Sequence, residues 1–285
     1  MRLVYVHGRS QQGKSELQIR TYWSGGLNNG FVAAGYKQFP VPASTDAPFY
    51  GDELLKLLET TNSVATRGAG DTDVDPIALA IAERMAERSH TNTTMAVESE
   101  VVERGPSEWG WVQTVLRSVS ERAPGFSETV LNQFVDDVMA YLSRATVRDA
   151  INGIVKPFIG GSEPTIVVGH SLGSVVAYSV LMELGTAARV PLYVTAGSPL
   201  GLRQIQDKLE DFHPIAFPAG VDAWINATDE RDIVALYASL DKESFIGGIE
   251  NLTDIDNRNF PHDIAGYLSD ARVADAIGKA IQAAA

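Results

Sequence analysis

The chain has 285 residues, of which 45% are hydrophobic and 21% charged, and this ordinary globular composition excludes a disordered or fibrous protein. Lysine and arginine total 23 against 36 aspartate and glutamate, and the resulting formal net charge of −13 argues against nucleic acid as a partner. The absence of cysteine excludes disulfide bonds and thiolate catalysis. No apolar run reaches the roughly 18 residues that a membrane-spanning helix requires.

The N-terminal residues 1–6 lead directly into an apolar run and lack the pattern of a secretory signal, so we expect a cytoplasmic protein. The five histidines show no metal-ligand spacing, and we expect neither a metal nor a cofactor. The sequence leaves peripheral contact with a membrane and the oligomeric state open.

Short apolar runs alternate with helical patterns along the chain, which predicts an α/β fold with a mostly parallel sheet and helices on both faces. The runs that we predict as strands are 2–6, 36–41, 164–168, 190–196 and 222–227. Gly8, Gly169 and Gly197 follow three of these runs. Open α/β sheets bind their ligands at the carboxyl ends of the strands, so these glycines mark the expected position of a site.

Residues 53–160 have a helical pattern, with apolar residues spaced at three and four positions. We interpret these stripes as core and predict a single α/β domain over 1–285. The block at 53–160 is a helical insertion, part of which is a candidate cap over the sheet edge. An acidic segment at 71–76 is predicted to be an exposed loop before the first of these helices. The stripes are Ile77, Ile81 and Met85; Val112, Val115, Leu116 and Val119; Phe134, Val138 and Leu142; and Val147, Ile151, Val155 and Phe158.

The segment Gly169-His170-Ser171-Leu172-Gly173 lies between a predicted strand and a helical run that extends to about Leu184. This G-x-S-x-G pattern is typical of a nucleophile elbow, in which a serine lies on a strained turn between a strand and a helix. A side chain at either glycine would collide with the closely packed neighbouring elements. The segment therefore predicts a nucleophilic Ser171.

A second motif competes with the first. Residues Gly8–Ser15 match G-x-x-x-x-G-K-S after a strand, the pattern of the phosphate-binding loop of P-loop nucleotide hydrolases. Such an enzyme also needs an acidic residue at the end of another strand to hold Mg²⁺. The predicted strands end in Gly169-His170, Ala196-Gly197 and Asn226-Ala227, and none supplies that residue directly. The nucleotide hydrolase remains the alternative function.

His7-Gly8, Gly169-His170-Ser171-Leu172-Gly173, Asp232 and His262 follow one another in this order, and with these residues the chain resembles the α/β-hydrolases. Thr195-Ala196-Gly197-Ser198-Pro199-Leu200 also resembles the G-S-P segment of lipase-like members. The resemblance covers residues 2–42 and 164–285. It departs from the family in two ways, since the usual first strands are missing and the helical insertion precedes the nucleophile strand. The second departure leaves the acyl pocket without a family template.

The resemblance implies a catalytic triad in the chain order serine, acid, histidine. Only His213 and His262 follow Ser171, and His213 precedes the strand that should carry the acid, so this order selects His262 as the base. The acid should follow that strand. Asp232, before Ile-Val, resembles the family's acidic element, while Asp229 is the alternative. Asp232 could also cap a helix extending through Tyr237.

His7-Gly8 resembles the H-G turn that supplies one oxyanion-hole amide in the family, so the resemblance implies that the backbone N–H groups of Arg9 and Leu172 bind the oxyanion. It further implies hydrolysis of carboxylic esters through an acyl-enzyme on Ser171. The expected substrate is a small-molecule or lipid ester. A non-catalytic binding domain with the same fold is a further alternative.

Overall fold

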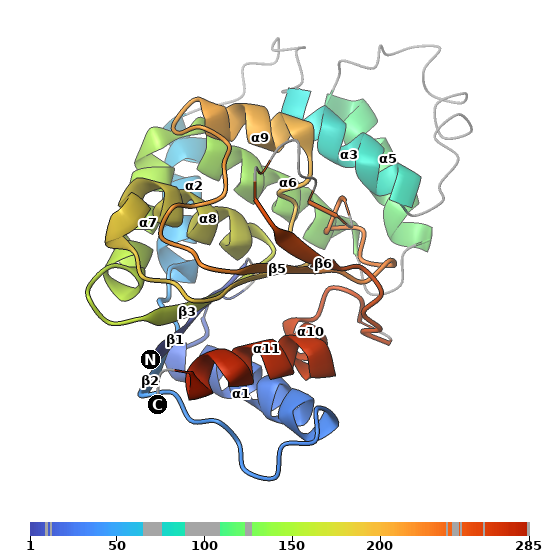
Figure 1. Cartoon of the computed structure of the whole chain (residues 1–285). Helices are drawn as coiled ribbons and strands as arrows, with labels where there is room; N and C mark the ends of the chain where they lie inside the picture. The colour runs from blue at the N-terminus through green and yellow to red at the C-terminus, as the bar shows by residue number, and fades with distance from the viewer. Residues whose placement is uncertain are drawn as a thin grey trace.

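The computed structural model describes residues 1–8, 11, 13–64, 76–88, 109–122, 127–237, 239–240, 245, 247–258 and 260–283. These residues form an α/β structure around one six-stranded sheet (Figure 1). Every pair of neighbouring strands is parallel. The predicted α/β class is therefore confirmed, and the sheet is more uniform than the mostly parallel one that the sequence predicts.

The sheet has the strand order β2-β1-β3-β4-β5-β6. After β1 the chain moves outward to β2 and then returns to the opposite side of β1 as β3, so the direction of winding reverses between β1 and β3. In open α/β sheets the crevice at such a reversal is the usual ligand site. The strands are β1 (Arg2–Val6), β2 (Ser44–Asp46), β3 (Thr165–His170), β4 (Tyr193–Ala196), β5 (Trp224–Ala227) and β6 (Ile249–Leu252).

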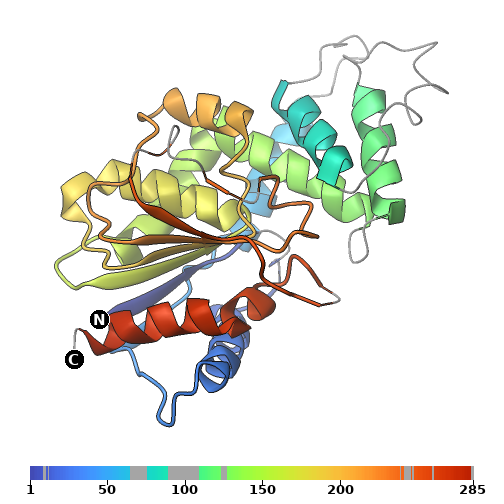
Figure 2. The same ribbon diagram turned by 45° about the vertical axis from the view of Figure 1, so that its right-hand side comes forward.

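Helices cover both faces of the sheet (Figure 2). Successive strand residues point to opposite faces, so Leu3 and Tyr5 enter one core cluster while Val4 and Val6 enter the other. The first face carries α1 (Glu16–Ala33), α10 (Ile264–Ser269) and α11 (Ala271–Gln282). The second face carries α2 (Gly51–Val64), α7 (Ala145–Ile159), α8 (Leu172–Leu184) and α9 (Arg203–Glu210), and a short 3-10 turn (Gly185–Ala187) follows α8.

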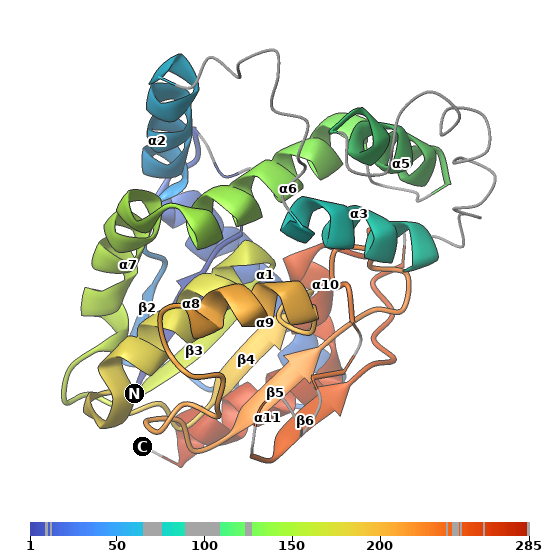
Figure 3. The same cartoon turned by 90° about the horizontal axis from the view of Figure 1, so that it is seen from above.

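Three further helices precede β3 and extend beyond the sheet. They are α3 (Pro76–Arg88), α5 (Trp109–Arg122) and α6 (Glu128–Ser143). In Figure 3, α3 and α5 lie side by side against α6. The stripe residues Ile77, Ile81 and Met85 of α3 are buried in the same core cluster as Val6 of β1. The apolar stripe of α3 is therefore core, as the sequence predicts.

Two strand predictions need correction. Residues 36–41 form no strand, and β2 begins later, at Ser44. The segment contains Pro40 and precedes Pro42; proline has no N–H to donate to a neighbouring strand, and Val41 is exposed. The strand β6 at the sheet edge was not predicted. The acidic loop proposed at 71–76 lies outside the described residues, except that Pro76 begins α3.

Among the helices of the described ranges, none combines the length and the apolar character that a membrane crossing requires.

Candidate active site

Ser171 lies at the junction of β3 and α8, beside the reversal point of the sheet. Its backbone has φ 55° and ψ −130°, a conformation that residues other than glycine rarely adopt, and its side chain is buried. Such a backbone costs on the order of 1–3 kcal/mol and persists only where the surrounding structure imposes it. The junction therefore has the strain that the G-x-S-x-G pattern predicts.

The two glycines of the motif allow this turn. A Cβ atom on Gly169 would lie 2.7 Å from the Cα of Ser174, which is closer than real Cβ atoms approach. On Gly173 it would overlap the backbone carbonyls of Val6 and His7 at the end of β1. The close packing expected at both positions is present, and it holds the first turn of α8 against β1.

The G-S-P segment contacts the turn through a hydrogen bond between Ser198 and Ser174. Ser174 Oγ donates to the Ser171 carbonyl at 2.5 Å and lies 2.6 Å from Ser198 Oγ. The hydroxyl of Tyr193 donates to the Ser174 carbonyl at 2.6 Å. All three hydrogen bonds are buried, so they fix the backbone that carries the candidate nucleophile.

The end of β1 packs directly on the candidate nucleophile. A Cβ on Gly8 would lie 2.8 Å from the Ser171 Cβ. His7 orients this end, because its Nε2 accepts the Tyr50 N–H at 3.2 Å and its Nδ1 donates to the Gly8 carbonyl at 2.7 Å. Burial lowers the pKa of His7 to about 4, which keeps the ring neutral. His7 thus acts on the site through the backbone of Gly8.

Leu172 and Arg9 are the two expected oxyanion-hole residues. Leu172 is the buried first residue of α8, and N–H groups of a first helical turn have no acceptor within the helix. An N–H in this position is suited to stabilise a developing negative charge. Arg9 lies outside the described residues.

His262 and Asp232 form a hydrogen-bonded pair at the same edge of the sheet. His262 Nδ1 donates to Asp232 Oδ2 at 2.8 Å. The other oxygen, Oδ1, accepts the backbone N–H groups of Val234 and Ala235 at 2.9 and 3.3 Å. Burial acts to raise the pKa of Asp232, but His262 and the hydrogen-bond donors outweigh it and lower that pKa below its ordinary value. Asp232 thus caps a turn with one oxygen and orients the histidine with the other.

His170 and Gly197, which lie close to Ser171, contact the His262–Asp232 pair. His170, directly before Ser171, donates from Nε2 to the His262 carbonyl at 2.9 Å, and the two rings lie 4.6 Å apart. Burial lowers the pKa of His170 to about 3, so this contact is made by a neutral ring. A Cβ on Gly197 would lie 2.7 Å from Asp232 Oδ2 and 2.9 Å from His262 Nδ1. Gly197 follows Ala196, whose carbonyl accepts the Ser171 N–H at 3.0 Å.

Asp229, the alternative acid, joins the two loops that carry the pair. Its carboxylate lies 2.8 Å from Arg231 Nη2 and accepts the Asn257 backbone N–H at 2.7 Å. The Asn257 side chain in turn donates to the carbonyls of Pro261 and Asp263, at 2.9 and 3.0 Å, on both sides of His262. Asp229 therefore fixes the shape of the histidine loop. The sequence patterns did not identify this clamp, because no motif marks Asn257.

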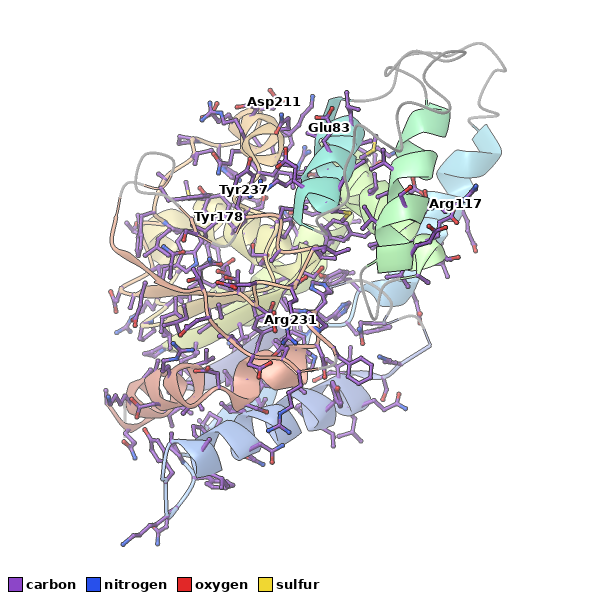
Figure 4. All side chains as sticks on the ribbon, turned by 90° about the vertical axis from the view of Figure 1, so that its right-hand side faces the viewer. Glu83, Arg117, Tyr178, Asp211, Arg231 and Tyr237 are labelled. Carbon is purple, nitrogen blue, oxygen red and sulfur yellow. The ribbon has the colours of Figure 1, made fainter. Side chains whose placement is uncertain are left out.

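A helix of the insertion reaches the segment after Asp232. Arg84 of α3 donates from Nε to the Leu236 carbonyl at 2.7 Å, and its guanidinium lies 4.0 Å from the centre of the Tyr237 ring. Figure 4 shows Tyr237 close to α3 and Arg231 closer to α10. At least one helix of the insertion thus contacts the segment that follows Asp232.

The described part of the P-loop-like segment makes other contacts. Gly13 N–H donates to the carboxylate of Asp52 at 3.1 Å, and Lys14 Nζ donates to Gln11 at 3.0 Å. Ser15 is the N-cap of α1 and forms a capping box with Gln18. A carboxylate on the Gly13 amide opposes the binding of a phosphate at this position.

The three strand ends named from the sequence carry no acidic residue, but β2, which was not predicted at its true position, ends in Asp46. Asp46 pairs with Val4 in the sheet, and its carboxylate lies 3.7 Å from Arg2 Nε. This places the carboxylate toward the start of β1, whereas a Mg²⁺ ligand would have to reach the loop after its end.

Within the part of the chain that the structure describes, no group of three or more histidine, aspartate or glutamate side chains could hold a metal ion. Comparisons of the chain with protein-family models, with curated proteins and with solved structures gave no match.

Proposed function

We propose that this chain is a serine hydrolase with an α/β-hydrolase fold, which cleaves carboxylic esters through an acyl-enzyme on Ser171. The observation that carries the proposal is a buried, strained serine directly after His170, whose ring lies 4.6 Å from that of His262, together with the His262–Asp232 hydrogen bond of 2.8 Å. The three residues come after β3, β5 and β6, respectively, and the carboxyl ends of these parallel strands lie at one edge of the sheet.

Serine needs a base to become a nucleophile at neutral pH. In the proposed reaction Ser171 Oγ attacks the ester carbonyl while Nε2 of His262 takes its proton. Asp232 holds the ring by Nδ1 and stabilises the imidazolium that forms. The same proton then passes to the leaving alcohol, and water activated by His262 releases the acid from Ser171.

The tetrahedral intermediates carry negative charge on the former carbonyl oxygen. The N–H of Leu172, at the start of α8, is the donor that we assign to it. The resemblance of His7-Gly8 to the family's H-G turn assigns the second donor to the N–H of Arg9. The close approach of Gly8 to Ser171 supports this assignment, because it brings the turn after β1 against the nucleophile.

The substrate that we propose is a small-molecule or lipid ester. None of the proposed steps requires a metal ion or a cofactor. The contact of Arg84 with the segment after Asp232 supports the proposal that part of the insertion borders the substrate.

A fluorophosphonate probe tests the function directly, since it reacts covalently with an activated serine. We expect labelling of the wild-type chain at Ser171, and we expect Ser171→Ala to abolish both labelling and turnover of p-nitrophenyl esters. Ser179→Ala is the matched control, because Ser179 is an equally buried serine in α8, the helix that begins directly after Ser171. Labelling that survives Ser171→Ala, or a wild-type chain that is never labelled, would contradict the proposal.

A further inference from the structure

The carboxylate of Asp232 accepts hydrogen bonds from four donors. Oδ1 takes two backbone N–H groups, and Oδ2 takes both His262 Nδ1 and the hydroxyl of Tyr267, the latter at 2.6 Å. The oxygen that faces the histidine is therefore shared with a tyrosine. Neither the sequence motifs nor the proposed triad gives this tyrosine a role.

The contacts of Tyr267 fix the direction of its hydrogen bond. Its hydroxyl oxygen lies 3.1 Å from the backbone nitrogen of Asp229, which can only donate. The hydroxyl proton is thus available for Asp232, and the 2.6 Å separation is typical of a bond to a charged acceptor. Burial and then the charge of Asp232 raise the pKa of Tyr267 well above its ordinary value, so the donor keeps its proton.

Tyr267 and His262 belong to one compact segment. Asp263 is the N-cap of α10, directly after His262, and Tyr267 lies one turn into that helix. A Cβ on Gly266 would overlap the side chain of Asn257, the residue that clamps the histidine loop. The segment that presents the base to Asp232 therefore also presents the tyrosine to the same oxygen.

We propose that Tyr267 is a positioning residue of the candidate triad, which holds Asp232 Oδ2 toward His262 and limits the negative charge that the histidine ring meets. This inference rests on the proposed serine hydrolase function. By donating to Oδ2, the hydroxyl draws negative charge away from the oxygen that accepts from His262 Nδ1.

The other charged and titratable groups around the pair have contacts of their own besides the Tyr267 hydroxyl. His170 faces His262 from the end of β3, with His7 behind it on β1. Asp229 faces Tyr267 and is paired with Arg231. Asp263 accepts a hydrogen bond from the hydroxyl of Tyr22 on α1 at 2.7 Å. A change in the titration of His262 can therefore be assigned to Tyr267.

The test is the pH titration of the histidine ring signals by NMR, with the His262 signals assigned through His262→Gln. In Tyr267→Phe we expect the His262 titration to move to higher pH by about one unit, because Asp232 then favours the imidazolium more strongly. The acidic limb of the kcat/KM profile for a p-nitrophenyl ester should move in the same direction. At pH values on this acidic limb, kcat/KM should fall about tenfold.

Tyr141→Phe is the matched control, since Tyr141 is an equally buried tyrosine whose hydroxyl donates to Asn152 at 2.7 Å on the opposite side of the sheet. It should lose stability without moving the titration. Incorporation of 3-fluorotyrosine at Tyr267 keeps the shape of the ring and makes a stronger donor, so it should move the titration to lower pH.

An unchanged His262 titration in folded Tyr267→Phe, or in the 3-fluorotyrosine protein where Tyr267→Phe does not fold, would overturn the proposal. The NMR measurement needs no substrate. A shifted titration in a chain that neither hydrolyses esters nor reacts with the fluorophosphonate would therefore support the role of Tyr267 at Asp232 and refute the proposed function.

Discussion

A single methyl group at Gly197 should separate the candidate base from the candidate acid. Gly197 follows β4 with φ 55°, and a Cβ built on it would lie 2.7 Å from Asp232 Oδ2 and 2.9 Å from His262 Nδ1. Ordinary contacts of a Cβ begin at 3.4 Å, so in Gly197→Ala the pair has to move by about 0.7 Å. The methyl group lies against both atoms of the hydrogen bond, and it therefore displaces the pair itself.

Gly197→Ala should lower both the stability and the rate of ester hydrolysis, and the two losses differ in size. An L-residue at this φ costs roughly 1–2 kcal/mol of stability, whatever surrounds it. A misplacement of catalytic groups by about 1 Å can cost on the order of 10²-fold in rate. We therefore expect kcat for a p-nitrophenyl ester to fall about 10²-fold in Gly197→Ala, with a loss of stability that leaves the chain folded.

Gly185→Ala is the control for the cost of placing an alanine at a positive φ. Gly185 has φ 51°, close to that of Gly197, and a Cβ there would meet nothing within 4 Å. Urea unfolding should give a similar or smaller loss of stability in Gly185→Ala, and ester kinetics should be unchanged. If both variants lost the same activity, or if Gly197→Ala kept full activity while folded, the geometry derived for the pair would be refuted.

Two further predictions concern the alternative assignments. Asp232→Asn should lower kcat by about 10⁴-fold, as in other triads, whereas Asp229→Asn should mainly lower the free energy of unfolding, by about 1–3 kcal/mol, because it weakens a clamp between loops. The opposite result in ester kinetics and urea unfolding would mean that the acid is misassigned. Lys14→Ala should leave ester hydrolysis unchanged, because the hydrogen bond described for the Lys14 side chain is to Gln11 and not to a residue of the proposed triad. Mg²⁺-dependent nucleotide hydrolysis that Lys14→Ala abolishes would favour the P-loop enzyme.

The sequence predicts the central strands best. The runs at 2–6 and 164–168 are mainly apolar and lie shortly before Gly8 and Gly169, and they form the neighbouring strands β1 and β3. The run at 36–41 is interrupted by Lys37 and Gln38, and Pro40 and Pro42 cannot donate a backbone hydrogen bond to a neighbouring strand. β6 lies at the edge of the sheet and is only partly buried, so its four residues carry little apolar signal.

For the candidate site, local motifs identify Ser171 because a nucleophile elbow needs its glycines at fixed spacing. They cannot separate Asp229 from Asp232, since both are acidic residues of one loop. The difference lies in the direction of each carboxylate, which depends on Arg231, Asn257 and Tyr267. A tyrosine in an amphipathic helix looks like any core residue in the sequence, and so the tyrosine was missed.

The two halves of the candidate site owe their shape to different forces. The elbow is set by backbone packing, because Gly169 and Gly173 leave no room for its neighbours to shift. In the loops of Asp232 and His262, side-chain hydrogen bonds from Asn257 and Tyr267 also hold the shape. Truncating Asn257 or Tyr267 removes a hydrogen bond, and no other described group replaces it. Substitutions away from Ser171 should therefore reach the chemistry first through the acid and base loops, while the nucleophile stays in position.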